Sequence, residues 1–178
     1  MPYCKKVMEL ITSTDMNGKV TDPENNLILA IGWSYENGNL GSIERKKGFV
    51  VSLKEESEEA KKFVNDMNID DVKNHEIVFY ENEVEMIVKF CEFISIIDPD
   101  ILTGFEVHNS SWGYLINRGD FLEIETSNIL SRVNENQINK IRDTWGYTHA
   151  SSIKITGRHM LNLWRTLKGE SKLESFSL

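Results

Sequence analysis

The chain has 178 residues, of which 40% are hydrophobic, and a formal net charge of −8. This length fits one domain with a real hydrophobic core, and no apolar run approaches the roughly 18 to 20 residues that cross a bilayer. The acidic balance argues against a domain that grips nucleic acid over its whole surface, because phosphate contacts need clustered lysine and arginine. Cys4 and Cys91 lie far apart and lack zinc-ligand spacing. We therefore expect one globular domain with no membrane partner.

Short apolar runs in the first half of the chain predict strands. Residues 13–26 are rich in Gly, Pro, Asn and Asp, which are typical of turns, and residues 37–39 (NGN) predict another turn. The acidic stretch 54–74 predicts a solvated helix or loop. The run 27–35 is apolar almost throughout, which is typical of a central strand buried on both faces. Four strands are expected here, at residues 7–12, 27–35, 49–53 and 77–80.

Asn82 begins the clearest predicted helix, because it forms a capping box with Glu85. Pro99 ends that helix, since proline cannot donate to the helix ladder. Residues 101–105 then predict a strand, and a strand after a helix is the unit from which α/β sheets are built. Apolar residues follow the cap at helical spacing: Val84, Ile87, Val88, Cys91 and Ile94.

The last third of the chain predicts further helices and one strand. Helices are expected to begin within residues 112–118 and to cover residues 134–143, and an amphipathic helix is expected over residues 159–168, after a turn at Gly157. Residues 153–156 predict a strand. The whole pattern indicates a three-layer α/β fold, of which the ribonuclease H-like fold is one member; periodicity alone does not select it.

Two segments of the sequence resemble the exonuclease region of family B DNA polymerases. Residues 98–115 begin with DPDILTGF and resemble the second exonuclease motif, in which a strand leads into a helix that opens with a metal-binding aspartate. Residues 157–165 (GRHMLNLWR) resemble a Gly-Arg-x-x-x-Asn-x-Trp-Arg stretch of the zeta-type branch. Ser-Trp-Gly-Tyr at residues 111–114 also resembles that branch. The motif residues, expected to be structural, are Asp98, Pro99, Asp100, Gly104, Trp112, Gly113, Tyr114, Gly157, Arg158, Asn162, Trp164 and Arg165.

The resemblance implies a ribonuclease H-like fold of the 3′–5′ exonuclease type, with a mixed sheet flanked by helices. It implies that residues 1–178 are an exonuclease-like domain, incomplete at its C-terminus, without palm, fingers or thumb. The parent would be a nuclear DNA-directed DNA polymerase for error-prone translesion synthesis. Its partners would be template-primer DNA and zeta accessory subunits. Its magnesium, and an iron–sulfur cluster if one is present, would lie outside this segment.

Exonucleases of this fold hold two divalent ions about 3.5 to 4 Å apart, and magnesium requires oxygen ligands. The resemblance implies an Asp-x-Glu pair on the first strand, an aspartate at the second motif and a later Tyr-x-x-x-Asp. It places the pair at Glu9 and Ile11, or one residue later, and the second aspartate at Ser111. The last ligand would lie beyond Leu178. At most Glu9 remains, so we expect no catalytic residue, metal or cofactor in this chain.

Other groups of residues give weaker indications of a functional site. Glu106 and Asp15 could replace missing carboxylates, but surface loop positions explain both. Arg158 suits a bidentate carboxylate or a backbone partner. The four histidines lack ligand spacing: His75, His108, His149 and His159. Three tryptophans could stack on bases, but packing is favoured: Trp112, Trp145 and Trp164.

The sequence therefore predicts a scaffold that packs against a polymerase core and frames DNA, with a degenerate metal site. Two alternatives stay open. One is an active 3′–5′ proofreading exonuclease with compensating carboxylates. The other is a stand-alone nucleic-acid-binding or interaction module.

Overall fold

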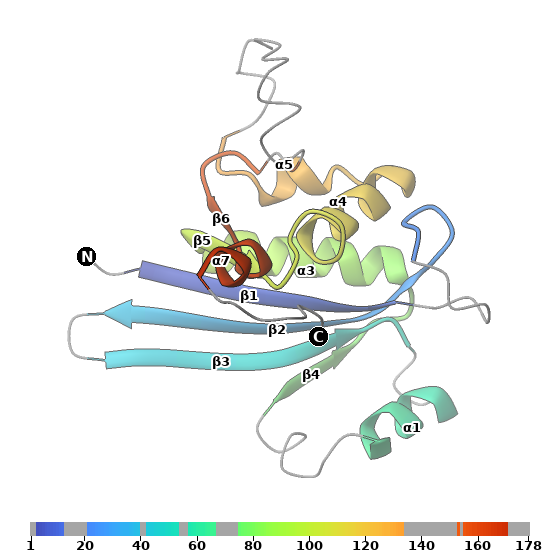
Figure 1. Cartoon of the computed structure of the whole chain (residues 1–178). Helices are drawn as coiled ribbons and strands as arrows, with labels where there is room; N and C mark the ends of the chain where they lie inside the picture. Colours follow the sequence, from blue (N-terminus) through green and yellow to red (C-terminus); the bar gives the residue numbers. More distant parts are fainter. Residues whose placement is uncertain are drawn as a thin grey trace.

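A computed structural model describes residues 3–12, 21–39, 42–53, 57–66, 75–133, 153 and 155–170. Within these ranges the chain forms a six-stranded mixed sheet in the order β4-β3-β2-β1-β5-β6, with helices packed beside it (Figure 1). This confirms the predicted α/β class and mixed sheet. No helix in the described ranges is long and apolar enough to cross a membrane.

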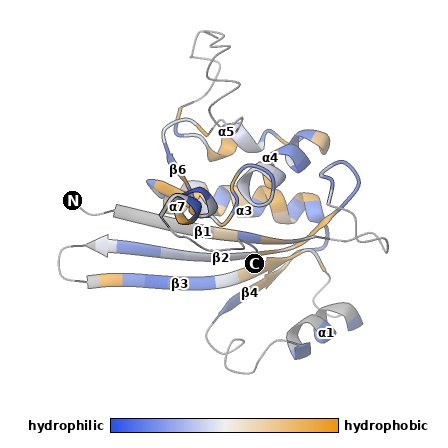
Figure 2. Ribbon diagram, in the orientation of Figure 1, coloured by the Kyte–Doolittle hydropathy of each residue, from blue (hydrophilic) through white to orange (hydrophobic). Residues whose placement is uncertain are grey.

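The first three strands form an antiparallel meander: β1 (Tyr3–Thr12), β2 (Ile28–Asn39) and β3 (Ser42–Val51). The central position predicted for the run 27–35 is confirmed, since β2 lies between β1 and β3. The turn predicted at residues 37–39 is wrong, because Gly38 pairs with Ile43 and the strand continues through Asn39. Backbone pairing in a long hairpin outweighs the local turn preference of this sequence. Figure 2 shows the hydrophilic character of the first half of β3.

The remaining strands are short and run parallel to their neighbours. β4 (Glu76–Phe79) pairs with β3, β5 (Ile101–Gly104) pairs with β1, and β6 (His159–Asn162) pairs with β5. The predicted strands at 77–80 and 101–105 are thus confirmed. The described helices are α1 (Glu58–Asp66), α3 (Glu83–Ile97), α4 (Trp112–Phe121), α5 (Thr126–Leu130) and α7 (Leu163–Glu170).

Helix α3 begins and ends where the sequence predicts. Asn82 Oδ1 accepts the Glu85 N–H at 2.9 Å, and Asp98 adopts a left-handed conformation (φ 50°) immediately before Pro99. The predicted apolar stripe is partly wrong, because Val84 is 44% exposed in the first turn. The buried residues of α3 are Met86, Ile87, Phe90, Cys91 and Ile94.

The hydrophobic core lies between the sheet and the helices α3, α4 and α5. Trp112 is fully buried against Phe90, with ring centroids 6.3 Å apart, and its indole N–H donates to the Thr103 carbonyl. Trp33 meets Phe93 edge to face. The prediction that Trp112 packs in the core is confirmed.

The C-terminal elements differ from the prediction. Residues 153, 155 and 156 are not in a strand. Instead, the Thr156 N–H donates to the Ser131 hydroxyl, and the Thr156 carbonyl accepts the Arg132 N–H. Residues 159–162 are not helical but form β6, because Met160 pairs with Leu102 at the open edge of β5. The helix begins only at Leu163. The predicted helix at 134–143 lies outside the described residues, and α5 was not predicted.

Candidate functional site

Glu9, the expected first-strand ligand, lies beside the C-terminal end of β5. The parallel register aligns Val7 with Thr103, which brings Glu9 next to Phe105. The Phe105 N–H donates to Glu9 Oε1 at 2.7 Å. Ile11 pairs with Ala30 through the backbone of β1. One carboxylate oxygen of Glu9 is therefore bonded to the main chain of the neighbouring strand.

Ser111, the expected second-motif position, immediately precedes α4 and is fully buried. Its Oγ donates to the Glu106 carbonyl at 3.2 Å. A Cβ added to Gly104 would clash with Ser111 Oγ, so the missing side chain at Gly104 is what allows this close approach. A neutral hydroxyl in such a closed position is a poor ligand for magnesium.

Glu106 uses its carboxylate to hold the turn after β5. Oε2 accepts the Asn109 N–H at 2.7 Å, and Oε1 accepts the Asn162 amide at 2.9 Å and the His108 N–H at 3.3 Å. Burial acts to raise the pKa of Glu106, but these hydrogen bonds hold the pKa below its ordinary value. Glu106 is half-buried, so it is more than the surface loop carboxylate that its position suggested.

Helix α7 is anchored at the same place. Asn162 Oδ1 accepts the Arg165 N–H at 3.2 Å and so caps the helix, while the Trp164 N–H donates to the Phe105 carbonyl at 2.7 Å. The Lys168 ammonium lies 4.6 Å from the centre of the Trp164 ring. Consequently the end of β5 is bonded to both β1 and α7.

The two segments that carry the family resemblance also meet at the Asp-Pro-Asp motif. Arg158 donates to Asp98 Oδ1 at 2.8 Å, to the Pro99 carbonyl at 2.6 Å and to the Leu130 carbonyl at 2.7 Å. The predicted backbone partner of Arg158 is confirmed, and the carboxylate of Asp98 accepts through one oxygen only, so that pair is not bidentate. Arg132, which the sequence reasoning missed, joins Asp98 at 2.6 Å and donates to the Gly157 carbonyl.

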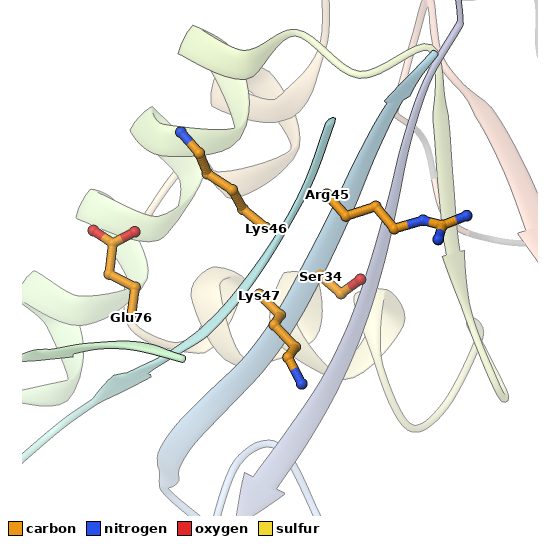
Figure 3. Close-up of a pocket in the computed structure, with 5 residues that line it drawn as sticks. All are labelled: Ser34, Arg45, Lys46, Lys47 and Glu76. Atoms are coloured by element: carbon orange, nitrogen blue, oxygen red, sulfur yellow. The ribbon is translucent and has the colours of Figure 1, made fainter. Parts of the chain in front are cut away.

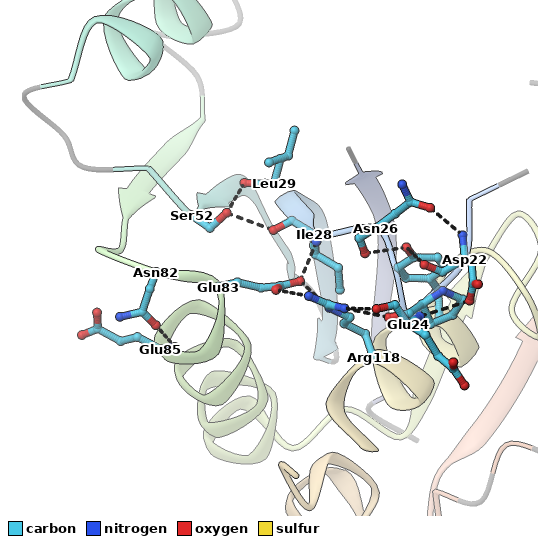
Figure 4. Close-up of polar contacts among 12 residues, drawn as sticks. Asp22, Glu24, Asn26, Ile28, Leu29, Ser52, Asn82, Glu83, Glu85 and Arg118 are labelled. Atoms are coloured by element: carbon cyan, nitrogen blue, oxygen red, sulfur yellow. Dashed lines mark hydrogen bonds and ion pairs between the residues drawn. The ribbon is translucent and has the colours of Figure 1, made fainter. Parts of the chain in front are cut away.

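A second buried cluster, also missed, holds the turn before β2 (Figure 4). Arg118 makes a bidentate ion pair with Glu83 at 2.9 and 2.8 Å and donates to the carbonyls of Pro23 and Glu24. Both charged side chains are nearly buried, at 5% and 10% exposure. Glu83 also accepts the Ile28 N–H. Only the Asp-Pro turn signal at residues 22–23 indicated that this loop has a fixed structure.

The described part of the chain shows no histidine or cysteine in a setting that favours catalysis or metal binding. Burial lowers the pKa of His108, and nearby Arg165 lowers it further. Burial raises the pKa of the Cys91 thiol to about 12. His75 packs against Phe49, and His149, Trp145 and Asp15 lie outside the described residues. Within those ranges, no three His, Cys, Asp or Glu side chains come together as a metal cage.

A pocket of about 560 Å³ lies beside β3, lined by Ser34, Arg45, Lys46, Lys47 and Glu76 (Figure 3). Three consecutive basic residues suggest an anion site, but two of them are already paired. Arg45 lies 2.8 Å from Glu36, and Lys46 lies 3.3 Å from Glu44. Exposed pairs of this kind contribute little to stability, and they leave the local charge close to balanced.

Comparison with known proteins agrees with the motifs. The family profile described as "DNA polymerase family B, exonuclease domain" matches residues 11–178. The chain is 33% identical to the DNA polymerase zeta catalytic subunit of Schizosaccharomyces pombe, over 99% of this chain and 12% of that protein. It is 44% identical to the subunit of Saccharomyces cerevisiae, over 57% of this chain and 7% of that protein. With the Homo sapiens subunit it shares 36% identity over 57% of this chain and 3% of that protein. The chain thus spans a small part of each relative.

Proposed function

Because the chain belongs to the exonuclease-domain family of the family B DNA polymerases, we propose that it is a nuclease-inactive exonuclease-like domain of zeta type. The observation that carries this proposal is the state of its two expected ligand positions. Glu9 accepts a main-chain N–H, and Ser111 is a buried hydroxyl where the resemblance expects a carboxylate.

Two-metal hydrolysis requires carboxylates that converge from several elements on a pair of cations. The described residues do not fit such a pair. Glu106 contributes a nearby carboxylate, yet both of its oxygens accept N–H donors of the chain itself. With no activated water and no stabilised leaving oxygen, a mismatched 3′ end would stay in place.

In this proposal the domain is a scaffold that helps frame the template-primer channel of a DNA-directed polymerase. The hydrogen bonds that join β1, β5 and α7 support this role, because they link three elements of the domain. The remaining part of the proposal follows from the resemblance. The whole enzyme would carry out error-prone translesion synthesis in the nucleus, together with accessory subunits. Palm magnesium would be held by other parts of the enzyme. The reading frame downstream of codon 178 tests this part, since palm motifs there are expected and a true stop favours a stand-alone module.

The nuclease claim is tested with the purified 178-residue protein and a 3′-labelled single-stranded oligonucleotide, in magnesium and in manganese. We expect no release of mononucleotides above the rate given by a Glu9→Gln control. Steady release by the wild type that the Glu9→Gln control lacks would instead establish a proofreading exonuclease.

A further inference from the structure

We propose that Asn162 keeps divalent cations out of the former metal site, because its side-chain amide stands where a cation would otherwise neutralise Glu106. This rests on the proposed function, in which the site no longer performs metal chemistry. Asn162 is almost fully buried, at 8% exposure, and lies at the junction of β6 and α7.

The orientation of the Asn162 amide is fixed from both ends. Its Oδ1 accepts the Arg165 N–H at 3.2 Å, so its Nδ2 must face Glu106, to which it donates at 2.9 Å. A flipped amide would lose both hydrogen bonds and would set two oxygens against each other, so the network assigns the amide unambiguously. The donor therefore points permanently at the Glu106 carboxylate.

N–H groups donate to both carboxylates at the end of β5. Glu106 receives N–H groups from His108, Asn109 and Asn162. Glu9 receives the Phe105 N–H, from the residue that directly precedes Glu106. Carboxylates with such donors are stabilised in the charged form without a cation. At Glu106, where both carboxylate oxygens accept N–H groups, a cation would have to compete with these hydrogen bonds.

An aspartate at position 162 would reverse this situation. It has nearly the same shape, and one of its oxygens could keep the cap on the Arg165 N–H. Its other oxygen would face Glu106 at hydrogen-bond distance. Two carboxylates so close cannot both stay charged unless a proton or a cation lies between them, and oxygen pairs of this kind are what magnesium and manganese prefer. The choice of asparagine over aspartate thus decides whether the site attracts cations.

The test is thermal unfolding of the 178-residue protein, in EDTA and in excess magnesium or manganese. The variants are N162D, N162A and the double variant E106Q/N162D. N162A removes both the cap and the donor without adding charge. The double variant exchanges donor and acceptor, because the glutamine amide at position 106 can donate to the new carboxylate at position 162. It therefore keeps a hydrogen bond between positions 106 and 162 and removes the second charge, at the cost of the 3.3 Å bond from the His108 N–H to the same atom of residue 106.

We expect the unfolding temperature of the wild type and of E106Q/N162D to change by less than about 1 °C on addition of the cation, because neither gains a site. N162A vacates the position of the amide but adds no second carboxylate beside Glu106, so its shift should be smaller than that of N162D. N162D should be the least stable protein in EDTA. Its unfolding temperature should rise by about 5 to 10 °C at a hundredfold excess over Kd. If N162D does not fold in EDTA, folding on addition of manganese supports the proposal equally.

An equal rise in the unfolding temperature of the wild type on addition of the cation would overturn the inference, because Asn162 would then not keep cations out of the site. An N162D protein that gains no stability or folding from cations would overturn it as well. Neither result concerns nuclease activity. Release of nucleotides by the wild type would overturn the proposed function whatever the response of N162D, so the two claims fail separately.

Discussion

Phe105 donates its backbone N–H to Glu9 Oε1 over 2.7 Å, across the junction of β5 and β1. In the family this end of the sheet is where the resemblance places the metal-binding carboxylates. Here Glu9 bonds to the main chain, and Ser111, the expected second-motif position, is buried. Both side chains thus make hydrogen bonds to main-chain atoms that directly follow β5.

Restoring two carboxylates should not restore nuclease activity. In the variant I11E/S111D, the new carboxylate at position 111 would be buried and would face the Glu106 carbonyl, which accepts the Ser111 hydroxyl in the wild type. We expect a loss of about 3 to 5 kcal/mol in unfolding free energy from the uncompensated charge. The two substitutions do not supply the later Tyr-x-x-x-Asp ligand that the resemblance implies, so we expect a 3′-labelled strand to remain intact.

The control for this variant is Ser111→Ala. It removes one hydrogen bond and adds no charge, so about 1 kcal/mol is expected. Tight manganese binding by I11E/S111D in calorimetry, together with nucleotide release, would contradict the placement of Ser111 at the second-motif ligand.

Removal of Arg118 should destabilise the fold strongly. Arg118→Met leaves Glu83 charged, nearly buried and without its bidentate partner, and it frees the carbonyls of Pro23 and Glu24. We expect a loss of about 3 to 5 kcal/mol by urea unfolding. Lys61→Met is the matched control, because its pair with Glu58 is exposed and contributes under about 0.5 kcal/mol. Equal losses in the two variants would refute the structural role of the buried pair.

Two glycines of similar helical context should respond oppositely to alanine. A Cβ at Gly113 would clash with the His108 carbonyl oxygen, a backbone atom, so Gly113→Ala should cost about 3 kcal/mol. Gly169 in α7 has nothing within 4 Å of its added Cβ, so Gly169→Ala should stabilise by up to about 1 kcal/mol. Thermal unfolding of both variants measures the difference, and a neutral Gly113→Ala would show that the turn at 106–111 is packed differently.

The ion pairs of Asp98 should appear in the pH dependence of stability. Hydrogen bonds from Arg132 and Arg158 hold the pKa of Asp98 below its ordinary value. A carboxylate with a depressed pKa stabilises the fold above its unfolded pKa of about 4, and that stabilisation is lost as the pH falls through the folded pKa. Asp98→Asn should therefore be less stable than the wild type at pH 7, and the gap should close below about pH 4.

Asp120→Asn provides the control of opposite sign. Asp120 is an exposed residue, but partial burial of its carboxyl raises its pKa, so its charged form weakens the fold slightly as the pH rises. The unfolding free energy of Asp120→Asn, relative to that of the wild type, should therefore increase as the pH rises from acid to neutral. Urea unfolding across the pH range measures both variants, and the same pH trend in both would contradict the assignment of the Asp98 pairs.

The sequence predicted the elements in which local signals and tertiary pairing agree. Asn82 and Pro99 set the ends of α3 because cap and proline chemistry are local. Residues 37–39 and 159–162 were assigned wrongly. Hairpin pairing with Ser42–Glu44 outweighs the turn preference of the first segment, and long-range pairing with β5 outweighs the helix preference of the second.

In the candidate site, too, the sequence indicates positions within a motif but not the contacts between distant residues. The family resemblance indicated Glu9 and Ser111 as site positions, but nothing local indicates that Glu106 would bond to Asn162, 56 positions later. The pair of Glu83 and Arg118 is hidden for the same reason, because two charged residues on separate helices give no sequence signal of their contact.

Anomalous scattering from crystals soaked in manganese tests the central claim most directly, because it detects cations at the site whether or not catalysis occurs. The account predicts no manganese peak beside Glu9 and Ser111, with the Glu9 to Phe105 hydrogen bond intact. Two peaks about 3.5 to 4 Å apart at that position would contradict it.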